Sequence, residues 1–265
     1  MSAALSILSL LRGGLNHLLP QACLLCGQEA GARAVCVACR ADLPLLPLPC
    51  CPVCATPLGH AATACGACLA RPPAFDATLA TWPYAFPVDR LVLMLKFNRR
   101  LASADFLAAG MLAGAHPEGG VKQHAGPSQV LLGPLGGQGR VAAFAGGAII
   151  VPVPLSAERL RLRGFNQSVE IARPLARALH LPLDVTSLVR TRDTAPQSLL
   201  PWRARQSNVR HAFDCSVDFS GRSVIVVDDV MTTGATLNAV ARTLKDHGAA
   251  RVVNWVAMRA VKALT

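Results

Sequence analysis

The segment from Val224 to Thr236 constrains the fold of this chain more than any other stretch. Its first four residues are β-branched and predict a buried strand that ends at Asp228 and Asp229. A loop of small and hydroxyl residues then leads into a predicted helix: Thr232, Thr233, Gly234, Ala235 and Thr236. Free backbone N–H groups at a helix N-terminus suit a phosphate, and adjacent carboxylates can accept hydrogen bonds from the hydroxyls of a ribose. The alternative is an ordinary strand and helix, with Thr232 or Thr233 as the N-cap.

The remaining pattern predicts an α/β fold. Short apolar segments alternate with amphipathic ones, and such strands form a parallel sheet that helices cover on both faces. The expected strands are 79–86, 149–153, 183–189, 223–228 and 251–257, and the expected helices are 165–179 and 235–247. One further helix is expected after the first strand, with an apolar face of Leu91, Val92, Leu95, Phe106 and Leu107. Residues 114–147, rich in Gly and Ala, are predicted to be a flexible insertion.

Nine of the ten cysteines lie in residues 20–73, which we expect to form a small domain ahead of a larger one at 76–265. Eight of them form four C-x-x-C pairs: Cys23 and Cys26, Cys36 and Cys39, Cys51 and Cys54, Cys65 and Cys68. Two such pairs complete a tetrahedral sulfur shell, so the spacing predicts two structural Zn2+ sites in tandem zinc ribbons. Neighbouring pairs are the favoured ligand sets, and a crossed arrangement of the first pair with the third is the alternative.

Disulfides are the other use of such cysteines, and they need an oxidising compartment. Nothing in the sequence directs export, so we expect zinc and a cytoplasmic location. Cys50, beside Cys51, is a spare thiol that could substitute as a ligand, and Cys215 is expected to be an ordinary buried cysteine.

Basic residues give the chain a formal net charge of +11 and a pI near 9.7. Residues 159–213 carry ten arginines against three acids, which indicates a polyanionic partner such as nucleic acid or a phosphorylated small molecule. Arg159, Arg161 and Arg163 follow Pro154 and Leu155 in a predicted turn, although alternation of Arg with Leu also fits an exposed strand. Residues 1–19 predict an amphipathic helix that packs on the protein, with membrane association as the alternative.

Several motifs resemble those of one family. The segment from 224 to 236 is similar to the phosphoribosyl pyrophosphate (PRPP) signature of type I phosphoribosyltransferases. The whole chain resembles the ComF family through further segments in the same order: Val151–Pro154, Arg159–Gln167, Arg190-x-Arg192, Thr194-x-x-Gln197, Arg203–Phe213, Leu95–Phe97 after Tyr84, and the double zinc ribbon. The stretch at 114–147 is longer than the family pattern leads us to expect.

The resemblance implies a type I phosphoribosyltransferase fold with a hood segment at 190–213. It also implies that Asp228 and Asp229 meet the ribose 2′- and 3′-hydroxyls and that the loop from Thr232 to Thr236 holds the 5′-phosphate. Mg2+ would arrive with PRPP, which Pro154, Leu155 and Arg159 would contact, and Arg159, Arg161 or Arg163 would neutralise the departing pyrophosphate. The implied role is DNA uptake and natural transformation, with single-stranded DNA and a helicase-like partner.

Three functions fit these expectations. The first is a phosphoribosyltransferase that acts in DNA uptake, the second is a PRPP-sensing adaptor without catalysis, and the third is a phosphoribosyltransferase of nucleotide metabolism. No dedicated general base is apparent in the sequence, where Glu158, Asp229 and His211 are candidates by elimination. The acceptor of the phosphoribosyl group stays open.

Overall fold

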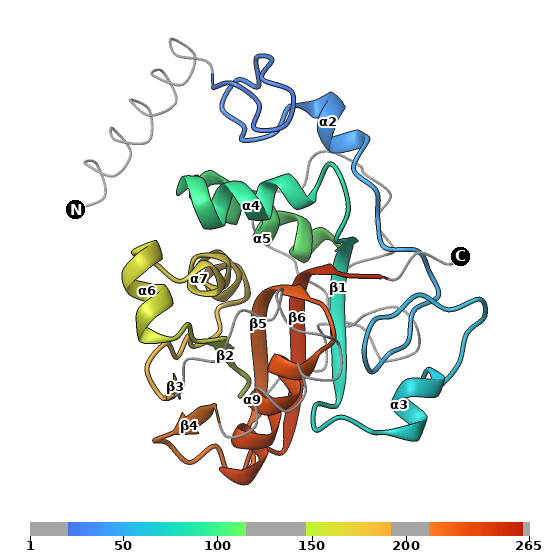
Figure 1. The fold of residues 1–265 in the computed structure, drawn as a ribbon, viewed down its shortest axis with the longest axis vertical. Helices are drawn as coiled ribbons and strands as arrows, with labels where there is room; N and C mark the ends of the chain where they lie inside the picture. The colour runs from blue at the N-terminus through green and yellow to red at the C-terminus, as the bar shows by residue number, and fades with distance from the viewer. Residues whose placement is uncertain (1–20, 115–146, 192–211, 262–265) are drawn as a thin grey trace.

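A four-stranded parallel sheet organises the chain, in the order β1-β6-β5-β2 (Figure 1). The computed structural model describes residues 21–114, 147–191 and 212–261. The strands are β1 (Ala77–Pro83), β2 (Ile149–Pro152), β3 (Leu188–Arg190), β4 (Phe213–Cys215), β5 (Ser223–Met231) and β6 (Arg251–Arg259). The helices are α2 (Val37–Ala41), α3 (Gly66–Ala70), α4 (Asp89–Asn98), α5 (Ala102–Gly114), α6 (Ala157–Arg163), α7 (Gln167–Leu179) and α9 (Ala235–Asp246). The predicted helix at 1–19, the insertion apart from its two end residues, and residues 192–211 of the predicted hood segment lie outside the described residues.

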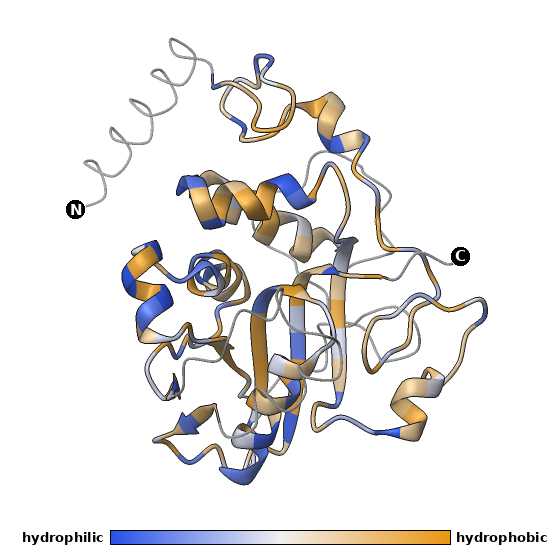
Figure 2. Ribbon diagram, viewed as in Figure 1, coloured by the Kyte–Doolittle hydropathy of each residue, from blue (hydrophilic) through white to orange (hydrophobic). Residues whose placement is uncertain are grey.

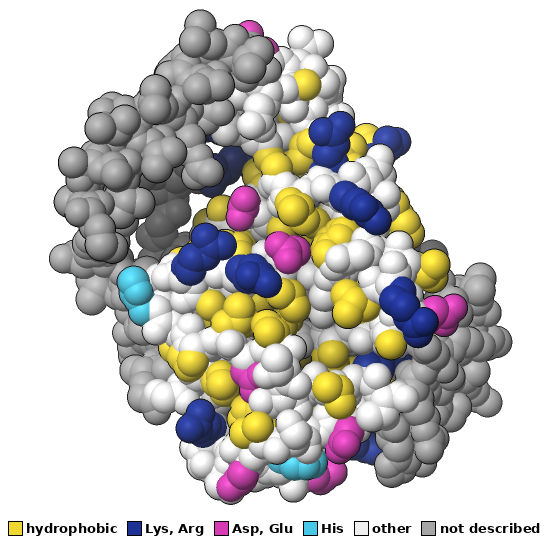
Figure 3. Space-filling model, turned by 90° about the vertical axis from the view of Figure 1, so that its left-hand side faces the viewer, with side chains coloured by type: hydrophobic (Ala, Val, Ile, Leu, Met, Phe, Trp, Pro, Cys, Tyr) yellow, Lys and Arg dark blue, Asp and Glu magenta, His cyan; other side chains and the backbone are white. Residues whose placement is uncertain are grey.

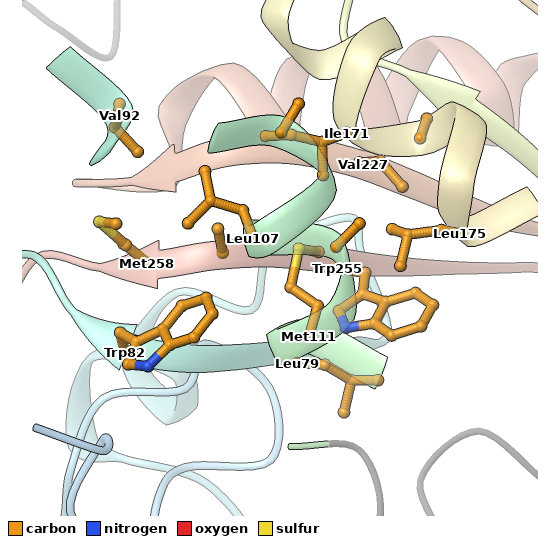
Figure 4. Packing of buried hydrophobic residues seen from close by; sticks show 14 of the residues in the cluster. Leu79, Trp82, Val92, Leu107, Met111, Ile171, Leu175, Val227, Trp255 and Met258 are labelled. Atoms are coloured by element: carbon orange, nitrogen blue, oxygen red, sulfur yellow. The ribbon is translucent and has the colours of Figure 1, made fainter. Parts of the chain in front are cut away.

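Side-chain alternation along β5 explains why both faces of the sheet are covered. Ile225 and Val227 point into the core beneath α4, α5 and α7, whereas Val224 and Val226 pack towards α9. Figure 4 shows the first of these cores, in which Trp255 of β6 lies between side chains of the strands and the helices. Burial of an aliphatic side chain such as Ile171 or Leu175 in this core stabilises the fold by about 1.5–3 kcal/mol. The predicted parallel α/β sheet, covered on both faces, is therefore confirmed.

The one helix expected after β1 is two helices, so that prediction was wrong. The chain turns at Arg99, which ends α4 in the left-handed conformation with φ 54°. The turn lets α5 fold back against β1, β6 and α7. Gly110 of α5 lies against the indole of Trp82, where an added Cβ would come 2.1 Å from a ring carbon. Close helix–strand packing, which sequence periodicity does not report, decides the break.

The predicted strand at 183–189 was also wrong in extent and partner. The Asp184 carboxylate accepts hydrogen bonds from the backbone N–H groups of Thr186 and Ser187, at 3.0 and 2.9 Å. This local turn interrupts the extended chain. Only Leu183 makes a parallel bridge, to Ile150 of β2, while β3 pairs antiparallel with β4 in a separate two-stranded sheet.

The cysteine-rich segment lies along the free edge of β1. Leu46 N–H donates to Thr81 O at 3.0 Å, and Thr78 N–H donates to Pro52 O at 3.2 Å. The first half of the segment contributes Cys23 to the core beneath α4 and α5, and the second half contributes Cys51 to the core beneath α9. The two halves therefore flank opposite faces of β1 and cover an edge that would otherwise present unpaired backbone groups.

Across the described segments, no helix combines the length and the apolar character needed to cross a membrane.

Candidate functional site

The candidate site lies at the carboxyl end of β5. Asp228 and Asp229 are within the strand, because its ladder with β6 continues to Met231 opposite Arg259. The expectation that the strand ends at the two acids was therefore wrong by two residues. β5 is coloured as hydrophobic along most of its length in Figure 2. Both carboxylates are nonetheless more than nine-tenths buried, which is unusual for charged groups and marks the place as specialised.

Asp228 is held by two donors. Its Oδ1 accepts a hydrogen bond of 2.9 Å from Ser168 Oγ at the start of α7 and one of 3.0 Å from the backbone N–H of Asp229. Burial, together with the neighbouring Asp229 carboxylate, raises the pKa of Asp228 to about 7. Lys96 and Ser168 oppose this rise. Asp228 thus resists ionisation in the free protein, so a ligand that brings donors or positive charge would favour its ionised form.

Lys96 reaches the acidic pair from α4. Its Nζ makes an ion pair with Asp229 Oδ2, and its side chain is 22% exposed against 5% for the aspartate. Sequence reasoning noted this lysine only as part of the family pattern and assigned it no role in the site. The sequence does distinguish this residue in one way: it is the first lysine in a chain whose basic residues are mostly arginine. Its distance in sequence from β5 concealed the contact.

The loop after β5 turns sharply at Gly234, which caps α9 with φ 79°. A Cβ at this position would come 2.6 Å from Met231 Cε, so the turn requires glycine. Thr233 Oγ1 accepts from Ala235 N–H at 3.1 Å. The N-cap is therefore Gly234 and neither of the threonines. Thr232, Thr233, Ala235 and Thr236 are all half-buried around the N-terminus of this twelve-residue helix.

The arginine-rich segment after β2 is the helix α6, so both the predicted turn and the alternative strand were wrong. Ser156 caps it, with its Oγ accepting from Arg159 N–H at 3.4 Å. Pro154 and Leu155 are half-buried between β2 and this cap, and Arg161 is exposed. On the face of the molecule that carries α6, basic and hydrophobic side chains are interspersed (Figure 3).

Arg163 is the arginine of α6 that the structure brings to the acidic pair. Its Nη1 donates to Gln167 Oε1 at 2.5 Å, and its guanidinium lies 5.8 Å from the ring centroid of Phe97. Burial lowers its pKa, the charge of Asp229 opposes that change, and the charge of Arg159 adds to it. Lys96 therefore pairs with one of the two buried carboxylates, and Arg163 lies within range of the charge of Asp229. Such a set suits a ligand with both hydroxyl and phosphate groups.

Two clusters of four cysteines have the arrangement of metal sites. Tetrahedral Zn–S bonds of about 2.3 Å place the sulfurs about 3.8 Å apart. Cys26 Sγ lies 3.8 Å from Cys36 Sγ, and Cys54 Sγ lies 3.6 Å from Cys65 Sγ. Each cluster is built from neighbouring C-x-x-C pairs: Cys23, Cys26, Cys36 and Cys39; Cys51, Cys54, Cys65 and Cys68. The residues fit two structural zinc ions, and they favour neighbouring pairs over a crossed arrangement.

The two remaining cysteines lie outside these clusters. Cys50 is buried and donates to Pro47 O at 2.9 Å, and it belongs to neither group of four. Cys215 is buried in β4, as expected for an ordinary core cysteine.

Arg259, at the end of β6, is a second residue that sequence reasoning missed. Its side chain is buried, and its Nε donates to Cys54 O at 2.8 Å while its Nη2 donates to Thr56 Oγ1 at 3.0 Å. Nη1 donates to Met231 O at 3.1 Å and also to Thr232 O. One guanidinium therefore links the second cysteine cluster to the loop ahead of α9. No carboxylate of the described residues lies within ion-pair distance of it.

Comparison with known proteins finds two family matches along the chain. A model of the phosphoribosyl transferase domain matches residues 166–261, and a model of the double zinc ribbon domain matches residues 14–69. The DNA utilization protein YhgH of Escherichia coli strain K12 is 34% identical over 246 residues, covering 91% of this chain and 97% of that protein. Competence protein F of Haemophilus influenzae is 28% identical over 237 residues, covering 86% and 91%. Competence protein ComFC of Bacillus subtilis is 34% identical over 111 residues, covering 40% and 42%.

Proposed function

Because the chain belongs to the ComF family, whose members join a double zinc ribbon to a phosphoribosyltransferase domain, we propose that it binds PRPP and acts in DNA utilisation. One observation carries the proposal. Asp228 and Asp229 lie side by side at the carboxyl end of a parallel strand, directly ahead of the Gly234 turn into α9. A ligand with vicinal hydroxyls and a terminal phosphate needs this combination of acceptors and donors within one short loop.

The ligand would lie across the carboxyl ends of the parallel strands. The carboxylates of Asp228 and Asp229 would accept hydrogen bonds from the ribose hydroxyls. The loop from Thr232 to Thr236 would donate to the 5′-phosphate from its backbone N–H groups and its hydroxyls. The helix dipole of α9 favours a negative charge at its N-terminus by about 0.3–1 kcal/mol. The buried charge of Arg259, which donates to the carbonyl of Thr232, adds positive potential beneath the same loop.

The pyrophosphate group would face α4 and α6. Arg163 and Arg159 supply forked donors for its oxygens, and Lys96 adds a third cation beside Asp229. Mg2+ bound to PRPP would share the charge of the pyrophosphate and help it to leave. In a transfer reaction these groups act by holding the ligand and neutralising the negative charge of the leaving group.

A sensing role is the second candidate, and the surroundings of the possible bases favour it. Asp229 is held by Lys96, and Glu158 is exposed on α6. His211 lies outside the described residues. Neither described acid is therefore free beside the ribose to take a proton from an acceptor. A protein with this site could bind PRPP tightly and turn it over slowly.

We expect PRPP with Mg2+ to raise the melting temperature of the protein. At a ligand concentration one hundred times Kd the stabilisation is about 2.7 kcal/mol, which corresponds to roughly 5–10 °C for a chain of this size. Asp228→Asn combined with Asp229→Asn should abolish the rise, because an amide cannot replace a carboxylate that accepts two hydroxyl protons. Differential scanning fluorimetry measures both.

The control for this experiment is Asp184→Asn, which changes a carboxylate in a turn beside Ile150, near the start of β2 rather than at the carboxyl end of β5. It should keep the full thermal shift. A shift of the same size in the double variant would contradict the PRPP assignment. Pyrophosphate release from PRPP, measured with and without single-stranded DNA, then separates the transferase from the sensor.

Single-stranded DNA is the proposed polyanionic partner, with a helicase-like protein acting beside it. The relatives named for DNA utilisation and competence support this role, as does the chain's net charge of +11. Residues 159–213 contain three aromatic residues that could stack on bases: Phe213 is buried, Phe165 is half-buried, and Trp202 lies outside the described residues. Contacts would therefore be mainly to phosphates.

Binding to single-stranded DNA should weaken steeply with salt. A site that neutralises about three phosphates loses roughly twentyfold in affinity between about 50 and 200 mM salt. Fluorescence anisotropy with a labelled oligonucleotide measures the slope. Replacement of exposed Arg161 by Gln should reduce the slope by about 0.7 if α6 takes part. An affinity that stays flat across this range would contradict electrostatic binding.

A further inference from the structure

The second cysteine cluster and the phosphate loop share one buried guanidinium. Arg259 ends β6 between β1 and β5, with Pro83 and Met231 as its neighbours in the sheet. From there its Nε and Nη2 reach Cys54 O and Thr56 Oγ1, and its Nη1 reaches the carbonyls of Met231 and Thr232. The ribbon and the loop are 177 residues apart in sequence, from 54 to 231, so these contacts are wholly tertiary.

The contact continues to a metal ligand. Thr56 Oγ1, which accepts from Arg259 Nη2, lies 3.2 Å from Cys54 Sγ. A zinc-bound thiolate can only accept, so the threonine hydroxyl then donates to it. Groups that hydrogen-bond to a metal ligand typically change metal affinity by about 10–100-fold when they are removed. Arg259 therefore acts on the cluster through Thr56, and on the loop through two backbone carbonyls.

The segment that directly follows the second ribbon also contacts α9 and the loop ahead of it. Ala74 N–H, just after the ribbon, donates to Asn238 Oδ1 of α9 at 2.7 Å. The ring of Phe75 lies 3.8 Å from the position of a Cβ built on Gly234. The first cluster differs, because its residues pack against the core beneath α4 and α5. Of the two clusters, only the second is tied to the phosphate loop through the described hydrogen bonds.

The buried charge of Arg259 explains how a ligand on the loop could strengthen this link. A buried cation without a carboxylate partner is costly unless an anion or several acceptors compensate it. Its acceptors here are neutral oxygens of the ribbon, of the loop and of the adjacent Ala260. A phosphate on the loop would supply the missing negative charge, which would strengthen the guanidinium's hold on both sides.

We propose that Arg259 is a positioning residue that couples zinc binding at the second cluster to ligand binding at the phosphate loop. The coupling rests on the proposed function, in which the loop holds the 5′-phosphate of PRPP. Linkage makes it reciprocal: an intact second zinc site tightens PRPP binding, and bound PRPP raises the zinc affinity of that site by the same factor. Coupling of this kind typically amounts to about 5–150-fold.

The test follows zinc loss from each cluster separately. The protein, with saturating PRPP or without it, is treated with a zinc-selective chelator in excess Mg2+ and pulsed with N-ethylmaleimide. Peptide mass spectrometry then reports which cysteines have become free. PRPP should slow alkylation about tenfold at the second cluster, read at Cys54 and Cys65, and leave the first cluster, read at Cys26 and Cys36, unchanged.

Arg259→Lys keeps the charge but cannot reach both the ribbon and the loop with a single ammonium group. It should bind PRPP about tenfold more weakly by calorimetry and lose the selective protection when PRPP is again saturating. Arg251→Lys, at the other end of the same strand, is the matched control and should behave like the wild type. If Arg259→Lys does not fold, Thr56→Val removes one hydrogen bond of the link and should reduce the protection.

Each outcome decides between the two proposals. Equal protection of both clusters, or full selective protection in Arg259→Lys or in a folded Thr56→Val substitute, overturns the coupling while PRPP binding stands. Wild-type protein that shows no PRPP binding by calorimetry overturns the proposed function, and the coupling with it.

Discussion

Removal of zinc is expected to unfold residues 21–73 and to lower the melting temperature of the whole chain by at least about 10 °C. The two short helices of this region have five residues each, and it has no sheet of its own. Structural zinc in such small units supplies about 10–16 kcal/mol of apparent binding free energy at neutral pH. Its loss also exposes the edge of β1 and part of both cores. Circular dichroism before and after chelation measures the change.

The zinc content of variants at two adjacent cysteines, Cys50 and Cys51, tests the assignment of the metal ligands. The wild type should contain two zinc ions per chain, and Cys51→Ser should contain one. Cys50→Ser should keep two, because Cys50 lies outside both clusters and its hydrogen bond to Pro47 O can be made by a serine. A folded chain without metal, or loss of zinc in Cys50→Ser, would contradict the assignment.

Asp228→Asn is expected to impair ligand binding. In the absence of ligand, its unfolding free energy relative to the wild type is expected to be higher at pH 8 than at pH 5. Burial raises the pKa of Asp228 to about 7, against an ordinary value of 3.8. A carboxyl whose pKa is raised on folding contributes stability below its unfolded pKa, and that contribution is lost as pH rises through the folded value. The loss therefore falls between about pH 4 and pH 7. The asparagine does not titrate and keeps an oxygen for Ser168 and for the Asp229 N–H.

The measurement is the difference in unfolding free energy between variant and wild type, by urea titration from pH 5 to pH 8. It should shift in favour of the variant by about 1–4 kcal/mol over this range. Asp184→Asn is the control, because the pKa of this carboxyl is shifted in the opposite direction. Hydrogen bonds from Ser187 and Thr186 overcome burial and lower the pKa of Asp184, so its effect should be flat above pH 5. A pH-independent difference for Asp228→Asn would show that this carboxyl is ionised throughout.

Much of the site was predictable because it is local in sequence. The apolar run from Val224, the two acids and the Thr-Gly loop follow one another directly, so strand, ligand groups and helix N-terminus could be ordered without tertiary information. The cysteine clusters were predictable for a similar reason, since C-x-x-C turns direct two thiolates to one point. The residues' proposed roles in binding PRPP stay predictions.

The missed residues are those that reach the site from elsewhere in the chain. Lys96 arrives from α4 and Ser168 from α7, and each meets a different carboxylate. Arg259 ends a strand that looked purely structural. The alternation of Arg and Leu also led to a wrong prediction for α6. This segment is a short helix that Ser156 caps at one end and Gly164 at the other. Propensity is a weak guide where a cap and a tertiary neighbour decide.

The order of strands bears on how the protein can be made. β1 pairs with β6, and its partner for Ala77 is Val253, close to the end of the chain. On the ribosome both ribbons and β1 emerge long before that partner is synthesised. Contacts between such distant segments form slowly, and an unpaired strand edge is prone to aggregate. Zinc capture by the nascent ribbons would therefore cover the β1 edge while the chain waits for its last strand.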